Sequence, residues 1–341
     1  MRSILLVALA LLVAACSGTP RPVGSRIPEG AVDAPVFEPE AFNFLVVGDW
    51  GRNGYFNQAD VARGMGIVGE AIGSRFTVST GDNFYLRGVT GVSDVKWRRS
   101  FEDIYRAPAL QSRWYVTLGN HDWMGNVAAQ VQYTERSDRW YLPAQYYAET
   151  LALPDSTADR PPPRVLMVFL DTQPIAVSRD RRRYFDSRAD WDDDAQLAWL
   201  DQTLAESDAE WKLVFGHHPV YTGSSRYSDS PVLIERLVPL FLRHGVQAYV
   251  AGHEHSLQHH RPAGSAIDYF ISGAGSLTRP VAQTPNTLFA YERPGFMAAS
   301  LSRDLMEVRF YDEDGRQLYA ADVPRVRGAR LPLPFQVPPA P

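Results

Sequence analysis

The residues best suited to chemistry in this sequence lie in short motifs that begin with glycine at the end of an apolar run. The motifs supply carboxylates, imidazoles, an amide and a phenol, all of which can bind metal ions. The candidate metal ligands are Asp49, Asp82, Tyr85, Asn120, His217, His253 and His255. The glycines in front of them would let the backbone turn tightly and approach an ion.

Two ions in one site need a ligand that contacts both, and two-metal sites place their ions roughly 3.5–4 Å apart. A carboxylate can bridge two ions, whereas an imidazole normally binds one. We predict that Asp82 is the bridge, because Asp49 and Tyr85 could then bind one ion and Asn120 with His217 the other.

His253 and His255 stand two residues apart in an expected loop, so both could point inward, one to each ion. Each residue type also has a structural explanation. Aspartate and asparagine form turns after strands, and Tyr85 could pack in the core. The metal hypothesis is favoured because all seven residues occur together at successive strand ends.

Apolar runs directly before the motifs predict short buried strands over 44–47, 76–78, 114–118, 212–215 and 246–250. Open α/β sheets place their sites at the carboxyl ends of such strands. The sequence therefore predicts that residues far apart along the chain meet at one edge.

The rest of the pattern predicts a mixed α/β fold in which two sheets are flanked by helices. Helices are expected over 58–72, 95–105, 195–205 and 232–243. Further strands are expected over 165–170, 269–271, 296–302, 306–311 and 318–323. His259 and His260 are expected on the surface of a strand.

The amino terminus resembles a bacterial lipoprotein signal. A basic start is followed by an apolar run over 4–15 that is too short to span a membrane, and Cys16 is the only cysteine of the chain. Leu12 to Cys16 resembles a lipobox, in which the signal is cleaved before a lipidated cysteine. The alternative is an ordinary signal peptide cleaved near Ala15.

We predict four segments: a signal over 1–16, a proline-rich tether over 17–40, a catalytic domain over 41–323 and a tail rich in proline and arginine over 324–341. Lipidated Cys16 would attach the protein to a membrane of the bacterial cell envelope, and Ser17 favours the outer membrane, facing the periplasm.

Composition limits the partners. The chain has 341 residues, is 45% hydrophobic and has a net charge of −5, without the clustered basic residues that mark a nucleic-acid surface. We therefore expect no nucleic-acid partner. The two-metal hypothesis, not the composition, predicts phosphorylated small molecules as substrates, and we expect a monomer.

As a set, the motifs GDWG, GDNFY, GNHD, GHHP and GHEH resemble the metallophosphoesterase superfamily. The Asp82-x-x-Tyr85 pair resembles the purple acid phosphatases, and the similarity to their small, tartrate-resistant type covers about 42–277. The resemblance implies a four-layer α-β-β-α sandwich of two mixed sheets.

The resemblance also implies which ions are held. Ferric iron would bind Asp49, Asp82, Tyr85 and His255, and ferrous iron, zinc or manganese would bind Asp82, Asn120, His217 and His253. The implied activity is that of an acid phosphatase, in which a metal-bound hydroxide attacks a phosphomonoester in line. Phosphate scavenging would be a plausible purpose.

Two further residues complete the expected site. His121 would face the substrate and position phosphate or protonate the leaving oxygen. The mammalian-type enzymes have a second histidine in the loop after GHxP, where this chain has Arg226, which can bind phosphate but cannot act as an acid. The alternatives are a phosphodiesterase or nucleotide hydrolase on the same scaffold, and a non-catalytic metal-binding surface lipoprotein.

Overall fold

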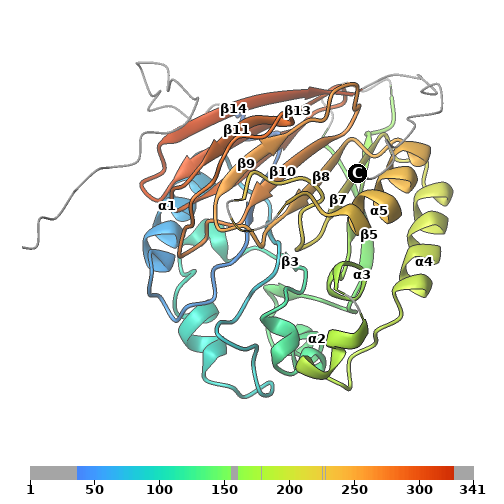
Figure 1. Cartoon of the computed structure of the whole chain (residues 1–341). Coiled ribbons are helices and arrows are strands. Elements are labelled where there is room, and N and C mark those ends of the chain that lie inside the picture. The colour runs from blue at the N-terminus through green and yellow to red at the C-terminus, as the bar shows by residue number, and fades with distance from the viewer. Residues whose placement is uncertain (1–36, 155–159, 178, 225, 227, 326–341) are drawn as a thin grey trace, which may run out of the picture.

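Two β-sheets stack face to face, and helices cover their outer surfaces (Figure 1). The computed structural model describes residues 37–154, 160–177, 179–224, 226 and 228–325. In this part of the chain each sheet has seven strands and mixes parallel with antiparallel pairs. The mixed α/β sandwich expected from the sequence is thus confirmed.

The first sheet joins three parallel strand pairs to an antiparallel carboxy-terminal meander. Its strands, in spatial order, are β14 (Gln317–Pro324), β13 (Leu305–Asp312), β12 (Gly295–Leu301), β1 (Phe42–Val47), β2 (Thr77–Ser79), β3 (Trp114–Val116) and β4 (Trp140–Tyr141).

The second sheet has a parallel centre with antiparallel strands at both edges. Its strands, in spatial order, are β11 (Thr287–Tyr291), β9 (Leu257–His260), β10 (Asp268–Ser272), β8 (Ala248–Ala251), β7 (Trp211–Phe215), β6 (Arg164–Phe169) and β5 (Tyr147–Ala152).

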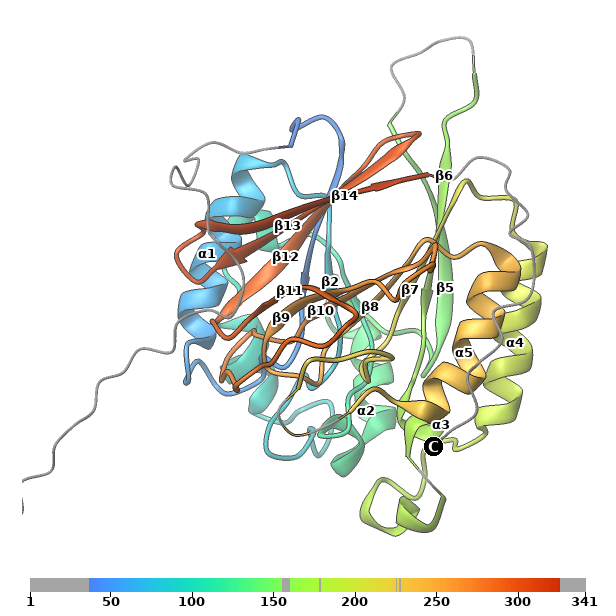
Figure 2. The same ribbon diagram turned by 45° about the horizontal axis from the view of Figure 1, so that its top comes forward.

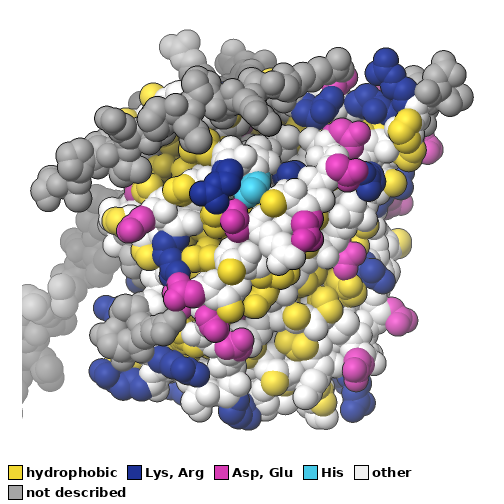
Figure 3. All heavy atoms as spheres, turned by 90° about the vertical axis from the view of Figure 1, so that its right-hand side faces the viewer, with side chains coloured by type: hydrophobic (Ala, Val, Ile, Leu, Met, Phe, Trp, Pro, Cys, Tyr) yellow, Lys and Arg dark blue, Asp and Glu magenta, His cyan; other side chains and the backbone are white. Residues whose placement is uncertain are grey.

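Helices lie outside both sheets, with α1 against the first and α4 and α5 against the second (Figure 2). The α-helices of the described residues are α1 (Gln58–Ala71), α2 (Val127–Gln132), α3 (Gln173–Ala176), α4 (Asp193–Glu206) and α5 (Pro231–His244). On the face that carries α4 and α5, acidic and basic side chains are interspersed (Figure 3).

Alternation along β6 shows how the layers are held together. Val165, Met167 and Phe169 belong to the core between the sheets, whereas the residues between them pack toward α4 and α5. Because successive side chains of a strand point to opposite faces, a strand buried on both faces is apolar throughout. The ring of Phe169 stacks on Tyr115 of β3 at 5.5 Å, which joins the two sheets.

Trp50 fixes the chain directly after β1. Its fully buried indole donates a hydrogen bond from Nε1 to Ser79 Oγ at 2.9 Å. The ring also has five aromatic neighbours within 6.5 Å, namely Phe84, Phe101, Tyr105, Trp114 and Trp140. The loop that follows β1 is therefore anchored by side-chain packing on one side.

Most strands and helices predicted from the sequence are confirmed to within a few residues. The helix expected over 95–105 is wrong in extent, because only Trp97–Glu102 forms a helical turn, of the π type. The strands β4, β5 and β11 were not predicted, and for β9 only the strand position of His259 and His260 was expected. His259 and His260 lie in β9 and are buried, so their expected surface position is wrong.

The predicted signal, lipobox cysteine and most of the tether and tail lie outside the described residues. Phe37, within the predicted tether, is buried, with the Arg309 guanidinium 5.5 Å from its ring. Among the described residues, no helix is both long and apolar enough to cross a membrane.

Candidate metal centre

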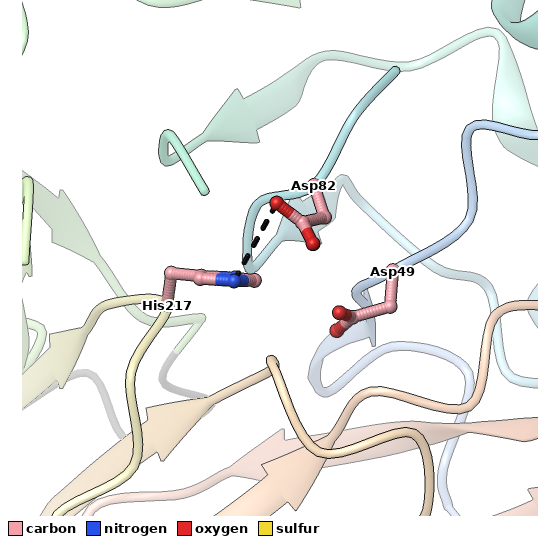
Figure 4. Close-up of side chains that lie close together, drawn as sticks. All are labelled: Asp49, Asp82 and His217. Carbon is pink, nitrogen blue, oxygen red and sulfur yellow. Dashed lines mark ion pairs between the residues drawn. The ribbon is translucent and has the colours of Figure 1, made fainter. Parts of the chain in front are cut away.

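The predicted ligands follow strands of both sheets at their facing carboxyl ends. Asp49, Asp82 and Asn120 follow β1, β2 and β3 of the first sheet, and His217 and His253 follow β7 and β8 of the second. Figure 4 shows Asp49, Asp82 and His217 directed into one space. Suitable ligand atoms of these three buried residues lie within 4.8 Å of one another.

The first cluster of ligand atoms is centred on the phenol oxygen of Tyr85. It donates to Asp82 Oδ2 at 2.8 Å or to Asp49 Oδ1 at 3.0 Å, and it lies 3.0 Å from His255 Nε2. His255 Nε2 is also 3.4 Å from Asp49 Oδ1. Four ligand atoms thus converge, from the residues that the resemblance assigned to the ferric ion.

The second cluster is centred on Asn120 Oδ1. This oxygen lies 3.2 Å from His217 Nε2 and 3.0 Å from His253 Nδ1, and those two nitrogens are 3.1 Å apart. His217 Nε2 is in turn 3.5 Å from Asp82 Oδ1. Asp82 therefore directs one carboxylate oxygen to each cluster, an arrangement that suits a ligand shared by two ions.

Electron-pair donors crowd together in the second cluster, which tests whether the residues fit a metal ion. His217 Nδ1 lies 2.8 Å from the carbonyl oxygen of Thr80, so in the neutral ring the proton sits on Nδ1. Its Nε2 then directs a lone pair toward Asn120 Oδ1 and Asp82 Oδ1. In that neutral form no hydrogen bond forms between these atoms, and a metal cation among them would satisfy all three, as a proton on Nε2 does in the imidazolium form.

The charges of the buried groups also favour a cation. Burial raises the pKa of the Tyr85 phenol well above its usual value, and Asp49 and Asp82 raise it further. Burial acts to raise the pKa of Asp82, but His217 and His121 lower it overall. Burial acts to lower the pKa of His217, yet Asp82 and Asp49 raise it overall. The carboxylates thus favour positive charge in the site, whether a proton on His217 or a metal ion.

Three predicted ligands have an unusual backbone conformation. Asp49, Asp82 and His253 have φ angles of 60°, 52° and 68°, in the left-handed region that residues other than glycine rarely adopt. Such conformations persist only where the surrounding structure enforces them, and they concentrate at functional sites.

Glycines allow backbone to reach the two carboxylates. A Cβ atom on Gly119 would lie 2.3 Å from Asp82 Oδ1, and one on Gly252 would lie 2.6 Å from Asp49 Oδ2. Any other residue would force the carboxylate away. The expectation that these glycines permit close approach in the site agrees with this packing.

Asp122, the last residue of the GNHD motif, ties two of the loops together. Its buried carboxylate accepts the backbone N–H of Asn83 at 3.0 Å and that of Gly119 at 2.8 Å. Burial raises its pKa to about 6, and the nearby Asp82 raises it as well. The sequence argument assigned no role to this residue.

His121 lies beside the first cluster and is partly open to solvent. Its Nδ1 is 2.6 Å from the Leu86 carbonyl oxygen, its Nε2 is 3.9 Å from Asp82 Oδ2, and its ring centroid is 4.4 Å from that of Tyr85. Arg226 is exposed, and its backbone N–H donates to Ser224 Oγ at 3.0 Å. His121 thus borders the ligands, whereas Arg226 is placed on a surface loop.

Two arginines near the clusters were missed from the sequence. The Arg52 guanidinium stacks 3.6 Å from the Tyr85 ring centroid, and the Arg279 backbone N–H donates to the His255 carbonyl oxygen at 2.9 Å. Arg52 directly follows the GDWG motif, and that position was the available signal. Arg279 lies in a loop without any pattern to identify it.

Comparison with known proteins agrees with this geometry. Residues 42–257 match the calcineurin-like phosphoesterase family. Purple acid phosphatase 17 of Arabidopsis thaliana is 37% identical, over 81% of this chain and 82% of that protein. The human tartrate-resistant acid phosphatase type 5 is 31% identical, over 84% of this chain and 91% of that protein.

This chain belongs to the purple acid phosphatases. It is therefore a phosphoesterase of a family whose members imply a binuclear metal centre. Among solved structures, GAP50, the anchor in the inner membrane complex of Plasmodium, superposes with a TM-score of 0.74 at 21% identity, over 85% of this chain and 91% of that one.

A purple acid phosphatase from yellow lupin superposes with a TM-score of 0.64 at 14% identity, over 85% of this chain and 55% of that one. At these identities, both structural likenesses show the fold alone.

Asp171, a buried carboxyl that follows β6, provides a test of the electrostatics. Burial raises its pKa to about 7, although hydrogen bonds from Gln145 and Trp123 oppose this. The folded protein keeps the Asp171 proton up to about pH 7, whereas the unfolded chain releases it at about pH 4. The contribution of the protonated carboxyl to the free energy of unfolding is therefore lost as pH rises through about 7. We predict that Asp171→Asn removes this loss, as measured by urea unfolding of metal-free protein at pH 5 and pH 8.

The control is Asp190→Asn. Asp190 has an exposed carboxylate, and its backbone N–H donates to the same Gln145 side chain. It should follow the wild-type pH dependence. If Asp171→Asn changed the free energy of unfolding equally at both pH values, the elevated pKa of Asp171 would be refuted.

Proposed function

We propose that this purple acid phosphatase hydrolyses phosphomonoesters with two metal ions that share Asp82. The observation that carries the proposal is the split of the Asp82 carboxylate, with Oδ2 at 2.8 Å from the Tyr85 phenol and Oδ1 at 3.5 Å from His217 Nε2. The two oxygens of one carboxylate thus face the two separate groups of candidate ligand atoms, as those of a bridging ligand would.

The proposed ligand sets follow the two clusters. Ferric iron would be held by Asp49, Asp82, Tyr85 and His255, because a phenolate suits a hard trivalent ion. Ferrous iron, zinc or manganese would be held by Asp82, Asn120, His217 and His253. When bound, the two ions would neutralise the phosphate oxygens and activate a water for in-line attack on phosphorus.

His121 is the proposed acid. The Leu86 carbonyl fixes its ring by accepting from Nδ1, which leaves Nε2 directed toward the site. In the imidazolium form, Nε2–H can be donated to the leaving oxygen of the ester. Arg226 is the proposed phosphate-binding residue at the rim. Its guanidinium offers several hydrogen-bond donors to phosphate, but it does not release a proton at ordinary pH and so cannot be the acid.

Metal content and colour test the ligand sets. We predict iron in the wild-type protein, with a broad visible band that disappears in Tyr85→Phe because that variant has no phenolate. Asp82→Asn should lower metal affinity and turnover by more than roughly 100-fold, which is the upper loss when a residue that only hydrogen-bonds a metal ligand is removed. The measurements are elemental analysis, absorption spectroscopy and hydrolysis of p-nitrophenyl phosphate.

A matched control is Asp60→Asn, which removes a half-exposed carboxylate of α1 and should retain both metal and turnover. Faster hydrolysis of bis-p-nitrophenyl phosphate than of the monoester would favour the diesterase alternative. Full turnover in Asp82→Asn would refute the proposed site, and metal binding without any turnover would favour the non-catalytic alternative.

Separate kinetic parameters test His121 and Arg226. His121→Gln should lower kcat by about 10²–10⁴-fold, the usual contribution of a general acid, with little change in KM. Arg226→Gln should mainly raise KM, because it removes a contact to bound phosphate. An unchanged kcat in His121→Gln would exclude that residue as the acid.

We also propose that lipidated Cys16 anchors the protein in the cell envelope, on the strength of the lipobox-like run before it. Two or more acyl chains bind membranes firmly, whereas one binds marginally. Cys16→Ser should therefore shift the protein from the membrane fraction to the soluble fraction, as measured by fractionation and immunoblotting. Equal distribution of both forms would argue for the ordinary signal peptide.

A further inference from the structure

Arg52 is held against the ring of Tyr85. Its guanidinium carbon lies 3.6 Å from the ring centroid, and its Nε donates a hydrogen bond to Ser276 Oγ at 3.1 Å. The Ser276 hydroxyl in turn donates to the backbone oxygen of Asp49 at 2.5 Å. The guanidinium is thus connected to two predicted ligands, one through its planar face and one through a serine.

Backbone contacts keep Arg52 and Tyr85 side by side. The Tyr85 N–H donates to the Gly51 carbonyl oxygen at 2.8 Å, and the Arg52 N–H donates to Gln58 Oε1 at 3.0 Å. Gly51 packs so closely on the second loop that a Cβ atom would lie 1.8 Å from the Asn83 carbonyl oxygen. The stack therefore follows from how the two motifs meet.

The charge of Arg52 is directed at the ring. Within the part of the chain that the structure describes, no carboxylate forms a hydrogen bond or ion pair with this guanidinium. A cation above an aromatic face is attracted to its π electrons. That attraction grows when the ring carries the negative charge of a phenolate, which is the form in which Tyr85 would bind a metal ion.

We propose that Arg52 is a positioning residue for the metal centre and acts through Tyr85. The stack orients the phenol oxygen toward Asp49 and Asp82, and the cation stabilises the negative charge that the ring carries as a ligand. This inference rests on the proposed ligand role of Tyr85. It differs from a substrate-binding role, in which the guanidinium would leave the ring and contact phosphate.

The experiment compares the visible band of ferric-iron-loaded wild-type protein with that of Arg52→Gln and Arg52→Lys. Removing the cation raises the energy of the filled phenolate level, so Arg52→Gln should move the band to longer wavelength. Iron affinity should fall about 10-fold or more, as for other outer partners of metal ligands. Arg52→Lys keeps the charge without the planar stack and should give a smaller shift.

Arg113→Gln is the matched control. The Arg113 guanidinium carbon lies 4.6 Å from the ring of Tyr141, a tyrosine outside the clusters, so its removal should leave the band and the iron affinity unchanged. Thermal unfolding of each variant identifies a general loss of folding, and a band shift in the folded Arg52→Lys protein supports the proposal even if Arg52→Gln is unstable.

Several outcomes would overturn the proposal. A band in Arg52→Gln identical to that of the wild type would show that the cation does not act on Tyr85. A raised KM with an unchanged band would assign Arg52 to substrate binding instead. Phosphatase activity in a ferric-loaded wild type without any visible band would end the Arg52 proposal and the ligand role of Tyr85 but leave the phosphatase function standing, whereas absence of turnover on phosphomonoesters and of metal would end the proposed function.

Discussion

The convergence of buried carboxylate, phenol, amide and imidazole groups from both sheets is the constraint on which the rest of this structure depends. Asp82 accepts a hydrogen bond from the Tyr85 phenol on Oδ2 and has His217 Nε2 3.5 Å from Oδ1, while the other ring nitrogen of His217 lies 2.8 Å from the Thr80 carbonyl oxygen. Buried carboxylates need a compensating positive charge, which a proton on His217 or a metal ion would supply. The surrounding fold can therefore be understood as the framework that holds these atoms together.

That framework uses rigid elements on several sides. Trp50 anchors the loop of Asp49 in an aromatic cluster, and Asp122 accepts N–H groups from two ligand loops at once. The left-handed conformations of Asp49, Asp82 and His253 are stabilised by this packing, since each would otherwise relax at a gain of about 1–3 kcal/mol. The strained conformations of these residues therefore depend on packing between distant parts of the chain.

The sequence predicted the ligand-bearing strands well, because each is a short apolar run that ends at a glycine, and such runs are local signals. Residues that act through tertiary contacts left weaker signals. His259 looks like a polar surface residue, yet it is buried with Nε2 2.7 Å from Asp268 Oδ1. The edge strands β5 and β11 are partly polar, and their pairing depends on neighbours distant in sequence. Arg52 was missed for the same reason, because its partner ring belongs to another motif.

The hydrogen bond from the His253 N–H to Asp49 Oδ2, at 2.8 Å, joins residues 204 positions apart. During synthesis, Asp49, Asp82, Tyr85 and Asn120 are made long before the three histidines. A nascent chain therefore exposes an oxygen-rich half-site that lacks every nitrogen ligand, and contacts of such sequence separation form late in folding. The full set of candidate ligands is consequently complete only after the second sheet has been made and has docked on the first.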